Sequence, residues 1–273
     1  MFAMQYHVAH MFVVMKMSQQ HTTGEEGIEV VENRPFEDNT LGKGQYTNKI
    51  YRLQSKIPSW LTTFATADAL VVQEEAWNAF PLCKSVNACG KILLLIMKSM
   101  PIGFAFLQCP YFPRFQLTIE TVHRPDNGQS ENVHGRSEEL EAREVEYIDI
   151  ASSEGNYWSY LVGNNNVDFS VFKSARTGRG PLLEGWQDRC DPVMTAYKLV
   201  TIDAPYWGFG YRLEQALIAG EKALFLESHR NCFSWIDEWY GMTVQQIREL
   251  EQQSHSALNE KLGKPMLTTS MGD

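Results

Sequence analysis

The sequence predicts an α+β fold in which a mostly antiparallel sheet packs against long helices. Several short stretches alternate between apolar and polar residues with the period of two that is typical of strands, and turn residues separate the first two. The C-terminal part instead follows the helical period over two long stretches, 213–239 and 243–263. The 273 residues are 44% hydrophobic and 12% aromatic, so they can bury a sizeable core as one large domain or two small ones.

Charge and cysteine content narrow the class of protein. The 24 basic and 33 acidic residues give a net charge of -9, which repels phosphate backbones and argues against a general nucleic-acid-binding protein. The five cysteines are odd in number and contain no C-x-x-C spacing, so they indicate neither a disulfide framework nor a zinc site. The N-terminus lacks the basic region and uninterrupted apolar run of a signal peptide. We therefore expect a protein of the reducing cytosol, without a bound metal.

A helix and two strands are expected at the start of the chain. Apolar and aromatic residues recur at helical spacing over residues 4–18, which predicts a short amphipathic helix. Residues 28–33 then predict a strand, and Pro35 with the run EDNTLGKG predicts a turn into the next strand. These two strands are expected to form an antiparallel pair.

The stretch from Gly44 to Trp60, GQYTNKIYRLQSKIPSW, is the most informative strand. Its period of two places Thr47 and Lys49 on one face, with Tyr51 and Leu53. Two interpretations remain open. The lysine belongs to an ordinary solvated face, or Thr47 and Lys49 point into an enclosed space that holds an anionic group, since a buried ammonium without a partner is costly.

Further strands are expected later in the chain, at 69–81, 115–123, 145–150 and 194–202. Between the first two of these, Gly90–Cys109 is apolar but is interrupted by Lys98, Pro101 and Gly103. It is too broken for a membrane-spanning helix, which needs about 20 consecutive apolar residues. It is either a buried strand pair or an insertion foreign to the fold.

Two loops also carry unusual residues. The segment FKSARTGRGPL, residues 172–182, clusters basic residues among glycines, and either an exposed flexible loop or a phosphate-contacting loop fits. The segment PYWG, residues 205–208, places Tyr206 and Trp207 on a turn, where they pack against the domain edge or contact something outside it.

The last helix carries an inward-facing carboxylate. Thr243 and Gln246 have the spacing of a capping box, which predicts that a helix begins there and ends near residue 263. Glu251 falls within the apolar stripe of this helix and so faces the body of the protein. It either extends to the rim or has a functional role, with Lys49 as the candidate partner.

Several segments together resemble the phosphatidylinositol transfer protein family over residues 6–262. They occur in the family's order and approximate spacing: GQYTNKIYRLQSKIPSW, EEAWNAFPLCKS, FKSARTGRGPL, AYKLVT, WG, and HRNCFSWIDEWYGMT followed by IRELE. The resemblance implies a single START-like domain over residues 1–273. In that fold a concave, mostly antiparallel sheet and long helices enclose a lipid cavity.

The resemblance also implies a set of ligand-binding residues. The family's inositol-binding threonine, lysine, asparagine and glutamate correspond by motif position to Thr47, Lys49, Asn78 and Glu251. A polyol needs several donors and acceptors in fixed positions, and these side chains supply them. Three further positions match residues beside the lipid or lining the cavity: Cys83, Ser85 and Thr121.

Two other features follow from the same resemblance. Tyr206 and Trp207 stand at the family's membrane-inserting pair of tryptophans, and aromatic residues prefer the membrane interface. Ser174 matches a serine proposed as a phosphorylation site, where a phosphate would add charge beside basic residues.

The function implied by the resemblance is that of a monomeric cytoplasmic lipid carrier that touches membranes transiently. It would exchange phosphatidylinositol and a second phospholipid, phosphatidylcholine or phosphatidic acid. Burial of roughly 30 methylenes avoids a transfer free energy of about 0.8 kcal/mol for each methylene, or about 24 kcal/mol in all, that their exposure to water would cost. No bond is made or broken, so we expect no catalytic residue and no cofactor. A scaffold that has lost transfer is the alternative, and a hydrolase is disfavoured because G-x-S-x-G is absent.

The chain departs from the family pattern at three places. Met1–Met4 leaves no room for the family's first strand, residues 90–109 are an insertion, and the loop 152–168 is divergent. Errors in the gene structure, with the insertion as translated intron, are our hypothesis for the first two, and transcript sequencing tests it. The sequence also leaves open which branch of the family the chain resembles more. HRPDNGQSENVH and Cys83 resemble the small transfer proteins, whereas REVEYIDIA and WIDEWYGMT resemble the retinal-degeneration-B branch.

Overall fold

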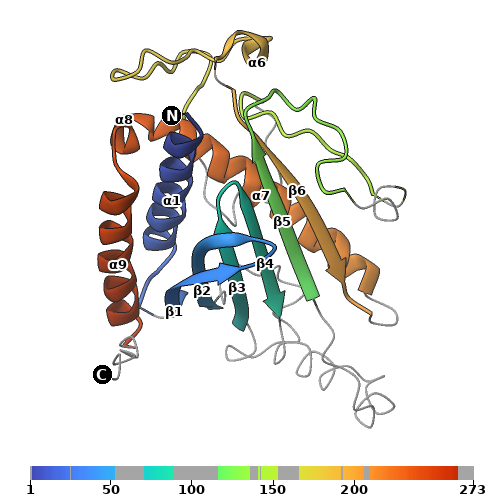
Figure 1. Ribbon diagram of the computed structural model, residues 1–273, viewed down its shortest axis with the longest axis vertical. Helices are drawn as coiled ribbons and strands as arrows, with labels where there is room; N and C mark the ends of the chain where they lie inside the picture. Colours follow the sequence, from blue (N-terminus) through green and yellow to red (C-terminus); the bar gives the residue numbers. More distant parts are fainter. Residues whose placement is uncertain are drawn as a thin grey trace.

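The computed structural model describes residues 2–24, 26–52, 71–88, 116–135, 141, 143–152, 166–191, 193–205 and 210–263. Within them, six antiparallel strands form an open sheet, and helices pack beside it (Figure 1). The strands are β1 (Gly27–Asp38), β2 (Gly42–Arg52), β3 (Val71–Ala79), β4 (Leu82–Ala88), β5 (Gln116–Arg124) and β6 (Thr195–Asp203). The helices are α1 (Phe2–Gln20), α6 (Trp186–Arg189), α7 (Gly210–Ser234), α8 (Ile236–Trp239) and α9 (Val244–Lys261). The α+β prediction is confirmed at this level.

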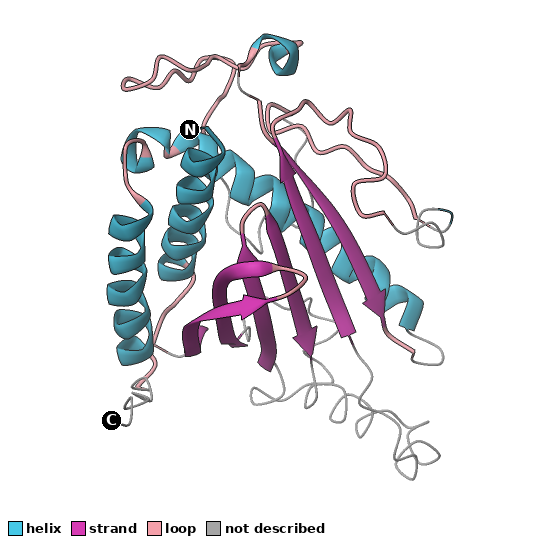
Figure 2. Cartoon of the chain, in the orientation of Figure 1, coloured by secondary structure: helices cyan, strands magenta, loops and turns pink. Residues whose placement is uncertain are grey.

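Each strand of the sheet pairs with its neighbour in the chain, in the order β1-β2-β3-β4-β5-β6 (Figure 2). The predicted helix at 4–18 and the predicted antiparallel pair at its start are confirmed as α1 and the hairpin β1–β2. The strand β1 is longer than expected and continues through Pro35 to Asp38. Proline is tolerated there because β1 is an edge strand of the described sheet, where a missing N–H breaks no inner ladder.

The hairpin from β3 to β4 turns over only two residues, Phe80 and Pro81, because Ala79 pairs directly with Leu82. The sequence pattern does not predict β4, whose seven residues LCKSVNA mix polar and apolar side chains without a clear alternation. The strand nonetheless lies inside the sheet, between β3 and β5. Its ladder partners, and not its own composition, make it a strand.

The predicted strand at 145–150 is wrong. Residues 143–149 have no regular secondary structure, and the side chains of Val145 and Tyr147 are 60% and 83% exposed. Alternating β-branched and aromatic residues favour a strand only where they pack against neighbours. Here the end of the segment is held by other groups, because Arg230 of α7 donates to the carbonyl oxygens of Ile150 and Ser152.

The helical pattern predicted for 213–239 is not one continuous helix. It ends as α7 at Ser234, and the short helix α8 begins at Ile236. The indole N–H of Trp239 donates to the carbonyl of Cys232 over 2.8 Å, so this carbonyl in the last turn of α7 bonds to a side chain. Apolar spacing alone does not separate one long helix from two helices joined by a single residue.

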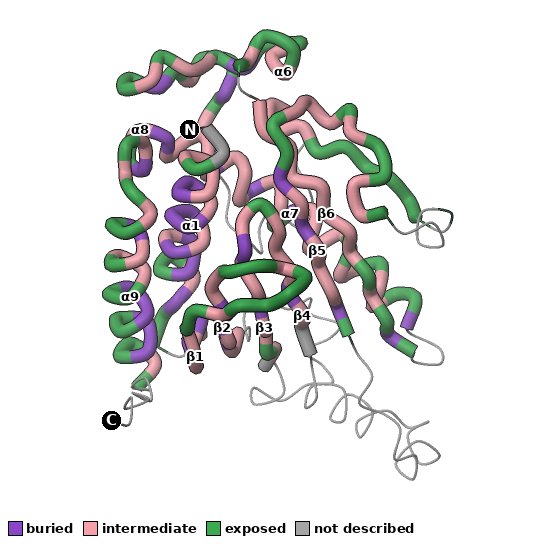
Figure 3. Tube along the Cα trace, viewed as in Figure 1, coloured by how far each residue is buried: buried purple, intermediate pink, exposed green. Residues whose placement is uncertain are grey.

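The main cluster of buried apolar side chains lies between α1, α8 and α9. Buried residues run along α1, as Figure 3 shows, and they meet Ile236 and Trp239 of α8 and Ile247 of α9. The predicted capping box starts α9 as expected, since the Thr243 hydroxyl accepts from the backbone N–H of Gln246 and the Gln246 side chain accepts from that of Thr243. This core fixes α1 and α9 side by side at one edge of the sheet (Figure 1).

Helix α9 is also joined to the edge strand through one side chain. The amide of Asn259, which is 2% exposed, accepts from the backbone N–H of Val30 over 2.9 Å and donates to its carbonyl over 2.8 Å. The register of β1 against β2 shifts between Val30 and Glu32, so the ladder is irregular at this point. Asn259 therefore satisfies backbone groups at a bulge and ties α9 to the sheet.

Three features discussed above lie outside the described residues: the insertion at 90–109, the turn of Tyr206 and Trp207, and residues 153–165 of the divergent loop. Among the described residues, no helix combines the length and apolar character that crossing a membrane requires.

Candidate functional site

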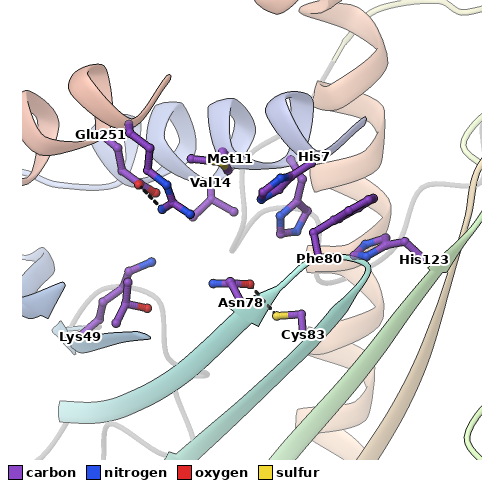
Figure 4. Close-up of a pocket in the computed structure, with 12 residues that line it drawn as sticks. His7, Met11, Val14, Lys49, Asn78, Phe80, Cys83, His123 and Glu251 are labelled. Carbon is purple, nitrogen blue, oxygen red and sulfur yellow. Dashed lines mark hydrogen bonds and ion pairs between the residues drawn. The ribbon is translucent and has the colours of Figure 1, made fainter. Parts of the chain in front are cut away.

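A pocket opens between the helices α1 and α9 and the strands β2 to β5 (Figure 4). Its lining atoms surround about 530 Å³ of space, part of which is open to solvent. Five of the seven predicted ligand-binding residues line it: Thr47, Lys49, Asn78, Cys83 and Glu251. Residues that are up to 204 positions apart in the sequence therefore meet around one pocket.

The strand β2 turns Thr47 and Lys49 toward the pocket. Only 5% of Thr47 and 8% of Lys49 is exposed, so the interpretation of Lys49 as a solvated surface lysine is wrong. The cross-strand partner of Lys49 is Glu74 of β3, and residues paired directly in a ladder share one face of the sheet. The carboxylate of Glu74 accepts a hydrogen bond from the hydroxyl of Tyr51.

The β3–β4 hairpin positions Asn78 and Cys83, which are a directly opposed pair. The thiol of Cys83 donates to the side-chain oxygen of Asn78 over 2.7 Å, and this contact orients the amide. Burial raises the pKa of Cys83 to about 11, so the group is a thiol at neutral pH and can act as a donor. A Cβ atom at Gly44 would overlap the carbonyl of Asn78, so only glycine lets β2 approach this close.

The helix α9 contributes Glu251 together with Arg248. The two side chains form an ion pair of 2.8 Å, with 12% of the Glu251 side chain exposed. The expected pairing of Glu251 with Lys49 is wrong, because among the residues that the structure describes no ion pair joins them. Lys49 instead lies across the pocket from the Arg248–Glu251 pair, which the dashed line in Figure 4 marks. Glu251 has an intrahelical partner because an arginine three residues earlier on a helix lies on the same face.

The polar groups at this end of the pocket are suited to contacts with hydroxyl groups. It offers an ammonium, a guanidinium–carboxylate pair, an amide and a hydroxyl, which together donate and accept several hydrogen bonds. Apolar side chains, including Met11 and Val14 of α1, complete the lining. The described part of the chain contains no group of three or more potential ligands placed to hold a metal ion.

The structure does not place Ser85 and Thr121 in the lining of this pocket. They lie on β4 and β5 and are 8% and 4% exposed. Thr121 is the ladder partner of Cys83, and its hydroxyl accepts from the ammonium of Lys198 over 3.4 Å. Both hydroxyls are therefore buried beside the pocket, on strands that form its floor.

Ser174 lies elsewhere, in the loop between residues 166 and 182. It is 2% exposed, and its hydroxyl donates to the carboxylate of Asp237 in α8. The same carboxylate accepts from the backbone N–H groups of Ala175 and Arg176 over 2.9 and 3.0 Å. These hydrogen bonds, with that from Ser174 the largest, lower the pKa of Asp237. The sequence suggested basic surroundings for Ser174, but its hydroxyl contacts an acidic group.

Sequence reasoning predicted five of the twelve lining residues and missed seven, among which four have aromatic side chains in contact with one another: His7, His10, Phe80 and His123. His7 of α1 stacks on the ring of Phe80 with centroids 4.9 Å apart, and Phe80 stacks on His123 of β5 at 5.4 Å. His10 of α1 meets His123 edge-on at 5.6 Å. The available signal was the spacing of His7 and His10, three residues apart and hence on one side of a helix. Nothing in the sequence pattern placed His123 or Phe80 beside them.

Comparison with known proteins gives long matches. The profile described as phosphatidylinositol transfer protein matches residues 1–256. Phosphatidylinositol transfer protein 2 of Dictyostelium discoideum is 37% identical over 262 residues, which cover 94% of this chain and 91% of that protein. Cytoplasmic phosphatidylinositol transfer protein 1 of Homo sapiens is 34% identical over 259 residues, covering 95% and 71%. Protein retinal degeneration B of Drosophila melanogaster is 35% identical over 280 residues, covering 95% of this chain and 20% of that protein.

Proposed function

The chain belongs to the phosphatidylinositol transfer protein family, and from this premise we propose that it binds one phosphatidylinositol molecule and exchanges it between membranes. The observation that carries the proposal is the meeting of Thr47, Lys49, Asn78 and Glu251 around one pocket. The names of the relatives from Dictyostelium discoideum and Homo sapiens describe the transfer of phosphatidylinositol. The pocket supplies the chemistry that a sugar alcohol needs.

In this proposal the inositol ring enters the polar end of the pocket. The ammonium of Lys49 and the guanidinium of Arg248 donate to ring hydroxyls, and the carboxylate of Glu251 accepts from them. The side chains of Asn78 and Thr47 complete the set, with the Asn78 amide oriented by Cys83. Ser85 and Thr121, which are buried on the adjoining strands beside the pocket, are the proposed contacts for the rest of the head group.

The acyl chains would lie in the enclosed part of a START-like fold. During transfer the acyl chains pass from an apolar bilayer to an apolar cavity. Each methylene therefore avoids the free energy of about 0.8 kcal/mol that its exposure to water would cost. The second ligand in this proposal is phosphatidylcholine or phosphatidic acid. No bond changes during exchange, so the proposed activity uses no catalytic residue and no cofactor.

The carrier would act as a cytoplasmic monomer that docks transiently on membranes. Tyr206 and Trp207 are the proposed docking residues, because large aromatic side chains favour the interface between lipid and water. The names of relatives such as the cytoplasmic transfer proteins of Homo sapiens and Drosophila melanogaster support the proposed compartment.

Transfer of labelled lipid between liposomes tests the proposal. We expect the unmodified protein to transfer phosphatidylinositol, and Lys49→Ala to lower that rate by about tenfold or more, as loss of a charged hydrogen bond does. Transfer of phosphatidylcholine by the same variant should change by less than about twofold. Lys43→Ala is the matched control, because Lys43 lies on the same strand but 79% of its side chain is exposed.

Two results would overturn parts of the proposal. An equal loss of transfer with both lipids in Lys49→Ala would show that Lys49 does not recognise the inositol head group. Lipid binding without transfer by the unmodified protein would identify a lipid-binding scaffold of the same family. Native mass spectrometry of the purified protein identifies the lipid that copurifies, and the liposome assay then decides whether that lipid is transferred.

A further inference from the structure

A chain of three side chains joins the helix α9 to the strands β1 and β2 beside the pocket. Gln45 of β2 donates from its side-chain amide to the side-chain oxygen of Asn33 in β1 over 2.5 Å. The amide nitrogen of Asn33 in turn lies 3.1 Å from Nδ1 of His255 in α9. These three residues are here named the amide–imidazole bridge. None of them belongs to the lining of the pocket, and the contacts proposed for the inositol ring leave them without a role.

The bridge has one consistent set of hydrogen-bonding roles. The side-chain oxygen of Asn33 accepts from Gln45, so the amide nitrogen of Asn33 is the atom that faces His255. An amide nitrogen only donates, and Nδ1 of His255 therefore accepts, which assigns the ring proton to Nε2. The imidazole is uncharged, because burial, and next the charges of Lys49 and Arg248, lower the pKa of His255 to about 3. A neutral imidazole of this tautomer completes the bridge.

The bridge lies on the face of the sheet that carries the predicted inositol-binding residues. Asn33 is the direct ladder partner of Thr47, and directly paired residues share one face. Gln45, Thr47 and Lys49 alternate along β2 and so point to that same side. Only 5% of His255 is exposed, so its ring is enclosed between α9 and the sheet. The bridge is therefore a neighbour of Thr47 and Lys49 on the pocket side.

The helix end of the bridge is close to the other wall of the pocket. His255 comes one turn after Glu251 on α9, and residues four apart lie on the same side of a helix. Figure 4 shows Lys49 across the pocket from Glu251. The charges of Lys49 and Arg248 both act on the pKa of His255, so the imidazole is near a cation of each wall. A hydrogen-bonded bridge at this place fixes how far apart the two walls stand.

The other ties between α9 and the rest of the protein act elsewhere. Asn259 bonds to the backbone of Val30, one turn beyond His255 and farther from Glu251. Ser254 accepts from Gln19 over 3.0 Å, so it holds α9 to the helix α1 and not to a strand. Among the hydrogen bonds that the described residues form between α9 and the sheet, that of His255 lies nearest along the chain to Glu251.

We propose that His255 is a positioning residue for head-group selectivity, which acts through Asn33 to set the distance between Lys49 on β2 and Glu251 on α9. The inference rests on the proposed function, since the head group is that of phosphatidylinositol. An inositol ring needs donors and acceptors at fixed places, so its binding is sensitive to this distance. The choline of phosphatidylcholine has no hydroxyl groups to bond with both walls, so its binding tolerates a change in width. His255 itself does not touch the lipid.

Transfer of labelled phosphatidylinositol and labelled phosphatidylcholine between liposomes measures the selectivity. His255→Leu keeps a buried side chain but cannot accept from Asn33. We expect its rate of phosphatidylinositol transfer to fall by about fivefold, as the loss of one hydrogen bond does, and its rate with phosphatidylcholine to change by less than about twofold. His255→Gln has a side-chain oxygen that can accept from the Asn33 amide, so it should restore about half or more of the lost selectivity.

A neighbouring residue supplies the matched control. Ser254→Ala removes a hydrogen bond from the preceding position of α9, which is 2% exposed, but the bond is to α1 instead of the strands. It should lower stability and leave the ratio of the two transfer rates unchanged within about twofold. If His255→Leu does not fold, Asn33→Ala breaks the same bridge from β1 and should give the same loss of selectivity.

A double-mutant cycle adds a readout that general loosening of α9 would not give. Asn33→Ala and His255→Leu remove the two partners of one hydrogen bond, so together they should lower the selectivity no more than either does alone. Nitrogen NMR of labelled histidine in the unmodified protein should show Nδ1 of His255 without a proton. The cycle tests the selectivity, and the spectrum tests the geometry on which it depends.

The contrary results separate the two proposals. An equal loss with both lipids in His255→Leu, no loss with either, or a similar loss of selectivity in Ser254→Ala overturns the positioning role and leaves the carrier function in place. Additive effects of Asn33→Ala and His255→Leu, or a proton on Nδ1 of His255, also overturn the positioning role alone. If the unmodified protein neither binds nor transfers phosphatidylinositol, the proposed function is wrong, and the inference is wrong with it.

Discussion

The guanidinium of Arg248 lies 2.8 Å from the carboxylate of Glu251, one turn later on α9, and both side chains line the pocket. Arg248 therefore holds the carboxylate in place at the pocket wall. We expect Arg248→Met to weaken phosphatidylinositol binding by about fivefold, because Glu251 loses a charge-assisted hydrogen bond. The free energy of unfolding should fall by less than about 1 kcal/mol, since 30% of the Arg248 side chain is exposed to screening solvent. Calorimetry with a short-chain lipid and urea denaturation measure the two effects. Unchanged affinity would place Arg248 outside the site.

Asn259 should be one of the more sensitive positions for stability. Asn259→Ala leaves the backbone N–H and carbonyl of Val30 buried without their partner, which costs about 2–4 kcal/mol for two such groups. Urea denaturation measures this loss. Ser256→Ala is the matched control, because Ser256 is exposed on the same helix and should change stability by less than about 0.5 kcal/mol. Equal effects of the two substitutions would contradict the role assigned to Asn259.

Stability should fall on mild acidification. Burial is the main cause that lowers the pKa of His123 to about 4, of His229 and His255 to about 3, and of His10 well below its usual value. An unfolded histidine binds a proton below about pH 6.5, so each of these groups favours unfolding by up to about 1.4 kcal/mol per pH unit below that value. Glu221 opposes them, because burial raises its pKa to about 7 and the folded state then holds the extra proton between about pH 4.5 and 7.

The net expectation is a free energy of unfolding that drops between pH 6.5 and 5. Urea denaturation across this range measures the slope. His229→Gln should reduce the slope by about one proton, or about 1.4 kcal/mol per pH unit. A slope that His229→Gln leaves unchanged would show that His229 titrates alike in the folded and unfolded states.

A negative charge at position 174 should release its loop. Ser174→Asp puts a carboxylate against Asp237 in a site that is 2% exposed, and like charges in contact repel. We expect faster hydrogen exchange at the amides of Ala175 and Arg176, which donate to Asp237. Ser174→Ala, which loses only the hydroxyl, is the control and should show a smaller increase. Slower exchange in Ser174→Asp would mean that basic residues capture the added charge.

Cys83 offers a chemical probe of occupancy. Because burial raises its pKa to about 11, alkylation by iodoacetamide should be slow at pH 7 and should speed up by about tenfold per pH unit with the thiolate fraction. Bound phosphatidylinositol should slow this reaction, since Cys83 lines the pocket. Cys190, outside the pocket lining, is the internal control and should react at the same rate with and without lipid. Equal rates at Cys83 in both conditions would place the ligand elsewhere.

Local signals in the sequence predicted the elements whose partners are near in the chain. The capping box of Thr243 and Gln246 sets the start of α9, and the turn chemistry before Gly42 sets the first hairpin, because both act within a few residues. The segment 145–150 failed for the opposite reason. Its alternation describes a surface suited to a sheet, yet no ladder receives it, and Tyr147 is left 83% exposed. Whether a segment forms a strand depends on the strands that can pair with it, and the periodicity of its own sequence does not identify them.

For the candidate site too, the sequence predicted local features but not contacts between distant segments. The period of β2 put Thr47 and Lys49 on one face but left open whether that face was inside, and only the packing of α1 and α9 settles it. The position of Glu251 on an apolar stripe was correctly interpreted, whereas its partner was not, since Arg248 competes from one turn away. His10 of α1 contacts His123 of β5 although more than 110 residues separate them in the sequence, and no local rule anticipates such a contact.

The arrangement of the strands also decides what has to move when a ligand enters. The sheet is a plain meander, so its ladders connect only consecutive strands, whereas α1 and α9 cover the pocket from outside the sheet. Displacement of these two helices would therefore uncover the pocket without breaking any hydrogen bond between the described strands.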